Sequence, residues 1–255
     1  MKKNQLFISL VICLSLFTFN ISAQSDMPAD AAKAYNEGNQ LMKSGNFDGA
    51  IGQYQSALTH AKDYRIYYQL GIALKKKGKD KEAIDAFKSS VGANPQFDLA
   101  YNGLGGTYFS QGNYAEAVEA FKKFEQTATK KQFKDKAKED MAKALVKQGE
   151  QSKKDGNYAN AVAQLNEAIK ISPLDAAYII LATTYYETAE YDKAIATADQ
   201  VLAMKNSKMH GAANYYKGMG FKQKQDLTKA KQLFEEAKKD VQYRKLAEYE
   251  LKLLK

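Results

Sequence analysis

The chain has 255 residues, enough for one or two ordinary domains or for a single long repeat array. Its formal charge is +9, but lysines alternate with acidic residues, which is typical of a solvated surface and argues against a nucleic-acid interface. Only one cysteine is present, which excludes disulfide bonds within the chain and metal sites built from several thiolates.

The first 23 residues have the order of a secretory signal peptide. Two lysines precede an apolar run, 6–19, and small residues ending at Ala23 supply a cleavage site. We expect residues 1–23 to be removed and the remainder to be exported to the periplasm or outside the cell. A retained membrane anchor is the alternative, although the run is short for a bilayer. The cysteine, Cys13, lies inside this segment, so the mature chain is expected to have none.

One pattern recurs after a linker, 24–30. The segment "QGNYAEAVEAFKKF", residues 111–124, returns as "SGNFDGAIGQYQSA", "KGKDKEAIDAFKSS" and "DGNYANAVAQLNEA", with two looser copies later. A small residue precedes each copy: Gly38, Gly71, Gly105, Gly149, Ala182 and Gly218. The successive intervals between these six residues are 33, 34, 44, 33 and 36 positions. A repeat of this length predicts an array of similar structural units.

Each unit is predicted to be a pair of antiparallel helices. In the third unit, apolar residues within 98–111 recur at the helical spacing, and Gly112 can take the left-handed conformation that ends a helix. Asn113 is then expected to cap the second helix with its side-chain oxygen. Gly105 and Ala117 are small, so we expect the two helices to approach closely at these positions.

Two regions depart from this rhythm. The longest interval contains 126–148, which lacks glycine and proline and is expected to extend the first helix of the fourth unit. The predicted organisation is therefore units one to three in 31–129, the long helix with units four to six in 130–239, and a capping helix in 240–255. The capping helix is expected to cover the last unit with an apolar face: Val241, Leu246, Tyr249, Leu253 and Leu254.

The pattern resembles the tetratricopeptide repeat over residues 31–239. The resemblance is carried by the aromatic, Leu-Gly and tyrosine positions of the third unit, by its later Ala and Phe, and by two prolines: Tyr101, Leu104, Gly105, Tyr108, Ala117, Phe121, Pro95 and Pro173. It implies an all-α fold, an α-solenoid of about six helix-turn-helix repeats with a C-terminal capping helix. Ala198 departs from the family pattern, which has a large aromatic residue there.

In the resembled family, the concave groove of the solenoid binds extended peptides or partner helices. Transferring the repeat frame gives ten candidate partner-binding residues: Asn36, Asn39, Arg65, Tyr68, Gln69, Asn102, Phe109, Tyr186, Tyr215 and Tyr216. One variant of the family grips a C-terminal carboxylate with Lys, Asn and Arg residues. Here only Asn39 matches that set, because its other positions hold Tyr35, Gln69, Leu99 and Gly103. The tails of cytosolic chaperones are therefore not expected as ligands.

No catalytic, cofactor or metal site is predicted. The two histidines, His60 and His210, lie 150 positions apart, and neither has a neighbouring pair of carboxylates. The glycines follow the repeat and do not form a phosphate-binding loop after a strand. We therefore expect no enzyme activity.

The sequence favours a non-catalytic scaffold or adaptor of the cell envelope that binds a protein or peptide partner in its concave groove. The alternative is binding of an anionic surface, such as lipid headgroups or polysaccharide, through the lysine-rich helix 130–154. That segment holds nine lysines against four acidic residues. Nucleic acid is not expected as a partner, peripheral membrane contact stays open, and the sequence predicts no oligomeric state.

Overall fold

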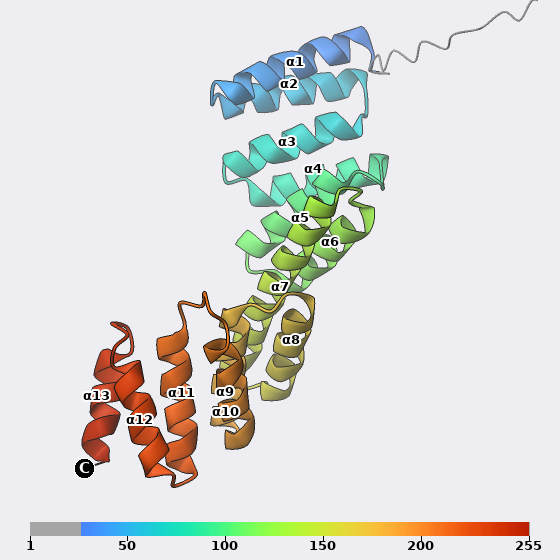
Figure 1. Cartoon of the computed structure of the whole chain (residues 1–255). Helices are drawn as coiled ribbons and strands as arrows, with labels where there is room; N and C mark the ends of the chain where they lie inside the picture. Colours follow the sequence, from blue (N-terminus) through green and yellow to red (C-terminus); the bar gives the residue numbers. More distant parts are fainter. Residues whose placement is uncertain (1–26, 255) are drawn as a thin grey trace, which may run out of the picture.

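The structure is a computed structural model that describes residues 27–254, which form thirteen α-helices and no strand (Figure 1). The expected signal peptide, its cleavage site and Cys13 lie outside the described residues. The helices are α1 Ala29–Lys43, α2 Phe47–His60, α3 Tyr64–Lys76, α4 Asp80–Ala93, α5 Asp98–Ser110, α6 Tyr114–Thr127, α7 Lys131–Lys154, α8 Tyr158–Ile171, α9 Asp175–Glu187, α10 Tyr191–Leu202, α11 His210–Gln223, α12 Leu227–Ala237 and α13 Arg244–Leu253. Helix α1 begins at Ala29, inside the linker expected for 24–30.

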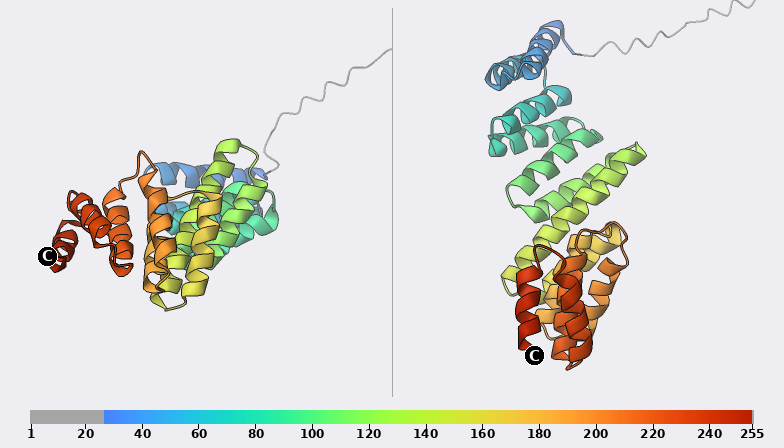
Figure 2. Two further views of the ribbon diagram at one scale, coloured as in Figure 1. Left: turned by 60° about the horizontal axis from the view of Figure 1, so that its bottom comes forward. Right: turned by 60° about the vertical axis from the view of Figure 1, so that its left-hand side comes forward.

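Consecutive helices pair into six hairpins, α1/α2 to α11/α12, and α13 follows the last hairpin. The hairpins stack one after another into an elongated, curved array with α1 and α13 at opposite ends (Figures 1 and 2). Each hairpin therefore contacts only its neighbours, as in other repeat proteins. The predicted all-α solenoid of about six helical hairpins with a further C-terminal helix is confirmed.

Close packing of a small residue against a large one holds the hairpins together. A Cβ atom placed on Gly105 would lie 2.6 Å from the ring of Phe121, and one on Gly71 would lie 2.6 Å from the ring of Phe87. Both rings are buried, so the absence of a side chain on the first helix creates the space that the second helix fills. Ala117 is fully buried beside them, as the close approach of the two helices requires.

The fifth hairpin solves the same packing problem with two small residues. Ala182 stands where the other five hairpins have glycine, and Ala198 stands where four of them have an aromatic ring and the fourth hairpin has Leu165. Both are fully buried, in a cluster that Ile179 and Val201 complete. Two buried alanines thus replace the glycine and ring of the other hairpins, and Ala212 and Ala213 of the next helix pack in the same cluster.

The turn inside the third hairpin follows the predicted backbone but not the predicted cap. Gly112 has φ of 79°, the left-handed conformation that favours glycine. Asn113 precedes α6, yet its side chain accepts no hydrogen bond from the helix; its amide Nδ2 lies 3.4 Å from Oε1 of Gln111 instead. The expected side-chain cap is therefore wrong at Asn113, although Asn46 caps α2 in that way by accepting from the N–H of Gly49 at 3.0 Å.

Residues 131–154 form one uninterrupted helix, α7, in the middle of the array. Its N-terminal part packs Ala137 and Met141 into the cluster that contains Phe124 of α6. Its C-terminal part pairs with α8 as the first helix of the fourth hairpin. One helix therefore belongs to two successive layers of the solenoid and joins its two halves.

The C-terminal helix α13 packs against the last hairpin through a different face from the one predicted. Ala247 and Leu251 are buried, together with Glu250, whose carboxylate lies 2.5 Å from the ammonium of Lys222 on α11. Of the five residues expected to cover the last hairpin, only Leu254 joins its core. The other four are exposed: Val241 by 79%, Leu246 by 48%, Tyr249 by 60% and Leu253 by 56%. The helix instead buries the stripe of Ala247, Leu251 and Leu254, and the ion pair between Glu250 and Lys222 lies at the same contact.

Candidate functional site: the inner face of the solenoid

The first helices of the hairpins line the inner face of the curve. Neighbouring first helices contact one another directly, α1 with α3, α3 with α5, α7 with α9, and α9 with α11. Elements on the inside of a curved stack lie closer together than those outside it, so these contacts place the first helices inside. Among the described residues no comparable contact joins α5 to α7, so the inner face has one part on α1, α3 and α5 and another on α7, α9 and α11.

The first part carries polar side chains that are open to a ligand. Gln69 of α3 and Asn102 of α5 are half-buried, and their side chains make no hydrogen bond to the residues that the structure describes. Tyr68, also half-buried, packs its ring edge-on against Phe97 with the centroids 5.2 Å apart. Burial, and then the nearby carboxylate of Asp98, raise the pKa of the Tyr68 hydroxyl, so this group stays protonated and can donate a hydrogen bond.

Two other predicted residues of this part already have partners. The guanidinium of Arg65 binds Asp63 through two hydrogen bonds of 2.9 and 2.6 Å, which raises the pKa of Arg65 and lowers that of Asp63. The side-chain oxygen of Asn39 accepts a 2.8 Å hydrogen bond from the hydroxyl of Tyr54, which uses one of its two acceptor positions. Arg65 is therefore held at the start of α3 by Asp63, and its charge is already paired, although three of its five N–H donors are not used in these two bonds.

Asn36 and Phe109 lie toward the edges of this part. Asn36 is exposed on α1, whereas Phe109 is half-buried at the end of α5 and packs edge-on against Tyr114 at 5.5 Å. Phe109 also lines a cavity of about 150 Å³, whose other lining residues come from α5, α6 and α7: Gly106, Phe121, Asp140 and Lys143. The cavity has room for a small group of a ligand.

The three predicted tyrosines of the second part pack largely against their own neighbours. Tyr215 is only 9% exposed and lies against the rings of Phe234 and Tyr243, at 5.8 and 5.6 Å. Tyr216 is half-buried beside Tyr215 and Tyr243, and burial raises its pKa to about 12. The hydroxyl of Tyr186 accepts a 3.2 Å hydrogen bond from Gln223. Tyr215 in particular is a core residue, a role that its sequence position alone does not reveal.

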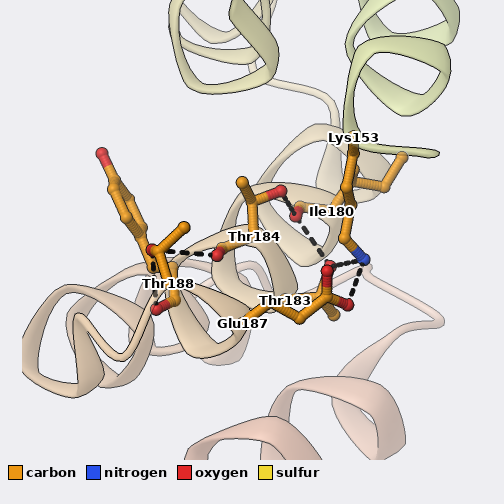
Figure 3. Close-up of polar contacts among 7 residues, drawn as sticks. Lys153, Ile180, Thr183, Thr184, Glu187 and Thr188 are labelled. Atoms are coloured by element: carbon orange, nitrogen blue, oxygen red, sulfur yellow. Dashed lines mark hydrogen bonds and ion pairs between the residues drawn. The ribbon is translucent and has the colours of Figure 1, made fainter. Parts of the chain in front are cut away.

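Polar contacts tie α7 to α9 in this second part (Figure 3). The ammonium of Lys153 lies 3.1 Å from the hydroxyl of Thr183 and 2.8 Å from a carboxylate oxygen of Glu187. Thr183 and Thr184 donate in turn to the carbonyl oxygen of Ile180, at 2.8 and 2.7 Å. These groups satisfy one another, so this part offers fewer free donors and acceptors than the first.

The sequence reasoning missed Lys75, which lies at the end of α3 on the inner face. Its ammonium nitrogen is 3.2 Å from the place that a Cβ atom of Gly106 would occupy. Burial lowers the pKa of Lys75, and it takes part in no ion pair with the described residues. The signal was present in the sequence, because Lys75 follows Tyr68, Gln69 and Ile72 at helical spacing.

The lysine-rich helix α7 does not present a free basic surface. Of the nine lysines in 130–154, seven form ion pairs: Lys131, Lys136, Lys138, Lys143, Lys147, Lys153 and Lys154. An eighth, Lys130, lies over the ring of Phe133 at 5.7 Å. Most of the positive charge is thus balanced locally.

Two other kinds of site are not found in the described part of the chain. In 27–254, no cluster of three or more His, Cys, Asp or Glu side chains has an arrangement that could hold a metal ion. Across the same stretch, none of the helices combines the length and apolar character needed to pass through a membrane.

Comparison with known proteins identifies the repeat. A tetratricopeptide repeat profile matches residues 35–96, 68–130 and 181–244, more than half of the chain. The solenoid of helical hairpins is the architecture of that class, and the chain belongs to the tetratricopeptide repeat family. Proteins of this family are generally non-catalytic scaffolds that bind other proteins or peptides.

Individual relatives are more distant. The small glutamine-rich tetratricopeptide repeat-containing protein 2 of Mycosarcoma maydis is 36% identical over 98 residues, which is 37% of this chain and only 28% of that protein. The C-terminal part of a TPR repeat-containing protein from Cytophaga hutchinsonii has a similar structure, with a TM-score of 0.60, 16% identity and 88% of both chains covered. YrrB, described as a TPR protein with an unusual peptide-binding site, has a TM-score of 0.52 at 18% identity, covering 78% of this chain and 97% of its own. At these identities the structural likeness concerns the fold.

Proposed function

We propose that the protein is a non-catalytic scaffold of the cell envelope that holds an extended segment of another protein on the inner face of α1, α3 and α5. The observation that carries the proposal is the pair of amide side chains, Gln69 and Asn102, which make no hydrogen bond to any residue in 27–254 and share the inner face of α3 and α5 with Tyr68. An extended peptide has backbone N–H and C=O groups without partners, and an amide can both donate to and accept from them. Tyr68 adds contact area with few rotors to immobilise.

The similar fold of YrrB, a protein described as having a peptide-binding site, supports this use of the solenoid. The other part of the inner face is less suitable, because Tyr186, Tyr215 and Tyr216 are engaged with one another and with nearby residues. We therefore assign the ligand to the part formed by the first three hairpins.

The proposed binding is tested by site-specific photo-crosslinking in cells. A photoreactive residue replaces Gln69 or Asn102 in turn, and a matched variant carries it at Gln55, an exposed position on the second helix α2. Both inner-face positions should capture the same protein, and Gln55 should not. The Tyr68→Ala change should reduce capture from Asn102 about tenfold, as expected for an aromatic anchor. Equal capture from Gln55 would contradict the assignment to the inner face.

We also propose export, on the strength of the order of charged, apolar and small residues in 1–23. Cell fractionation followed by intact-mass measurement tests it. The expected result is a periplasmic or secreted chain that begins at Gln24. A chain that keeps residue 1 and stays with the cytosol would contradict it.

Binding of an anionic surface through 130–154 is not a second proposal. Seven of the nine lysines there already neutralise acidic neighbours, so the described residues give no specific observation in its favour.

A further inference from the structure

Three lysines occupy the same place in alternate hairpins. Each lysine lies four positions after the glycine at which the first helix of its hairpin packs against the second. The pairs are Gly71 and Lys75, Gly149 and Lys153, and Gly218 and Lys222. Since the hairpins share one packing scheme, the three side chains leave their helices in the same direction, toward the next helix of the inner layer.

Two of the three lysines meet a carboxylate there. Lys153 of α7 binds Glu187 of α9 at 2.8 Å and also contacts the hydroxyl of Thr183 (Figure 3). Lys222 of α11 binds Glu250 of α13 at 2.5 Å. In both cases the neighbouring helix pairs the cation and compensates for its partial burial.

Lys75 lacks such a carboxylate. Where α9 has Thr183 and Glu187, one and five positions after Ala182, helix α5 has Gly106 and Ser110, one and five positions after Gly105. The ammonium of Lys75 lies directly over Gly106 and forms no ion pair with any residue in 27–254.

The electrostatic surroundings leave this half-buried cation uncompensated. Burial is the largest influence on Lys75 and disfavours its charged form; the charge of Asp80 acts in the opposite direction from beyond ion-pair distance, and that of Lys76 adds to the effect of burial. Gly106 has no side chain to fill the space in front of the ammonium, and it borders the cavity of about 150 Å³ beside Phe109. The carboxylate that lines this cavity, Asp140, is already paired with Lys136 and Lys143.

We propose that Lys75 is a carboxylate-binding subsite of the peptide groove, where an acidic side chain or a free C-terminus of the bound peptide takes the place that Glu187 has at Lys153. The proposal rests on the proposed function and adds the chemistry of the ligand. The groove thus binds the peptide in two ways. Gln69 and Asn102 contact its backbone, and Lys75 binds a carboxylate close to that part of the backbone. A charge-assisted hydrogen bond to a partly desolvated ammonium is stronger than one formed at the surface.

Short synthetic peptides test the proposal by nuclear magnetic resonance. The four probes share one Gly/Ser sequence of about eight residues. An extended chain of that size is about 27 Å long. They carry either a central Glu or a central Gln, and either a free or an amidated C-terminus. The signal of the lysine Cε group is assigned to Lys75 by its loss in the Lys75→Arg variant, and its shift is followed as each peptide is added.

The Glu peptide with an amidated end, or the Gln peptide with a free end, should move the Lys75 signal, and which of them does so identifies the source of the carboxylate. The amidated Gln peptide should bind about tenfold more weakly. The Ser110→Glu variant, which supplies the carboxylate that α9 has, should weaken binding of the carboxylate peptide by a similar factor. Lys153→Met, the matched change at a paired lysine, should leave binding unchanged.

Equal affinity for the neutral and the carboxylate peptides would overturn the proposal, as would a Lys75 signal that no peptide moves or a Ser110→Glu variant that binds normally. Photo-crosslinking from Gln69 distinguishes this failure from a failure of the proposed function. If capture from Gln69 persists in the Lys75→Met variant at its full level, the groove binds a partner without this subsite, and only the carboxylate proposal falls.

Discussion

The inner faces of the two parts of the solenoid differ although the same framework carries both. On α3 and α5, Gln69, Lys75 and Asn102 have no side-chain partners among the described residues. On α7, α9 and α11, the corresponding layer is closed by contacts such as that of Lys153 with Glu187 and by the tilted and edge-on packing of aromatic rings around Tyr215. The comparison shows that hairpin packing sets the shape of the solenoid, while the inner residues decide whether a given part can still bind a ligand.

The largest effects are expected where the two parts are alike, in the rings that fill the space left by a glycine. Phe121→Ala in the third hairpin and Phe234→Ala in the sixth should each lower the free energy of unfolding by about 3–5 kcal/mol, because each leaves a cavity in a core. Both rings are almost fully buried. Urea unfolding followed by circular dichroism measures the loss. A cost below about 1 kcal/mol for either ring would show that the two parts do not share this packing.

Two tyrosines then separate framework from ligand-binding positions. Tyr215→Ala should lower the free energy of unfolding by about 3 kcal/mol, because the ring is buried against Phe234. Tyr68→Ala should cost about 1 kcal/mol, since the ring is half-exposed, yet it should reduce capture of the partner. The same unfolding assay and the crosslinking from Asn102 provide the two readouts. The reverse order of stabilities would contradict the contrast between the two parts.

The turns inside the hairpins give a smaller contrast. Gly112 has φ of 79°, as do other turn glycines within a few degrees, but the fifth hairpin has Ala189 in this conformation with φ of 60°. Gly112→Ala should destabilise the protein by about 1 kcal/mol, and Ala189→Gly should stabilise it by roughly 0.5 kcal/mol. Ala189 is exposed, so no packing is lost in the second change. Opposite signs in urea unfolding are the expected result, and equal signs would refute it.

The repeat made most of the fold predictable, because Gly, Ala and aromatic residues recur at positions where helices meet. The prediction failed at α13, which buries Ala247 and Leu251 beside the ion pair of Lys222 with Glu250 and leaves most of the predicted stripe exposed. It also failed at Asn113, whose side chain turns toward Gln111. Periodicity reveals neither which of two apolar stripes a helix buries nor where a single polar side chain turns.

The candidate site was less predictable for a related reason. The repeat frame identifies which positions face inward, but it does not show which side chains are already bonded. Arg65 is held by Asp63 and Tyr215 by Phe234, whereas Gln69 and Asn102 remain available. Lys75 is recognisable as a site only when its neighbour across the helix contact is known to be Gly106.

The smallest expected effect concerns the dependence of stability on pH at Lys75. Burial holds the pKa of Lys75 in the folded protein below its ordinary value of 10.5, and of the charged neighbours Asp80 opposes this shift while Lys76 adds to it. Between the folded and the ordinary pKa, the unfolded chain binds more protons at this position than the folded chain does. The contribution of Lys75 to the free energy of unfolding therefore rises with pH across that window.

At a pH below the pKa of Lys75 in the folded protein, the free-energy cost of burying the charged ammonium lowers the stability of the parent protein in full. The Lys75→Met variant does not have this cost. The difference in stability between this variant and the parent protein should thus be most favourable to the variant near neutral pH and should decrease as the pH approaches 10.5. Urea unfolding of both proteins over this range measures the difference, with Lys122→Met at an exposed position of α6 as the control for removing one lysine. A difference that grows with pH would mean that the ammonium of Lys75 is stabilised in the folded protein, and it would remove the electrostatic reason for a ligand carboxylate at this position.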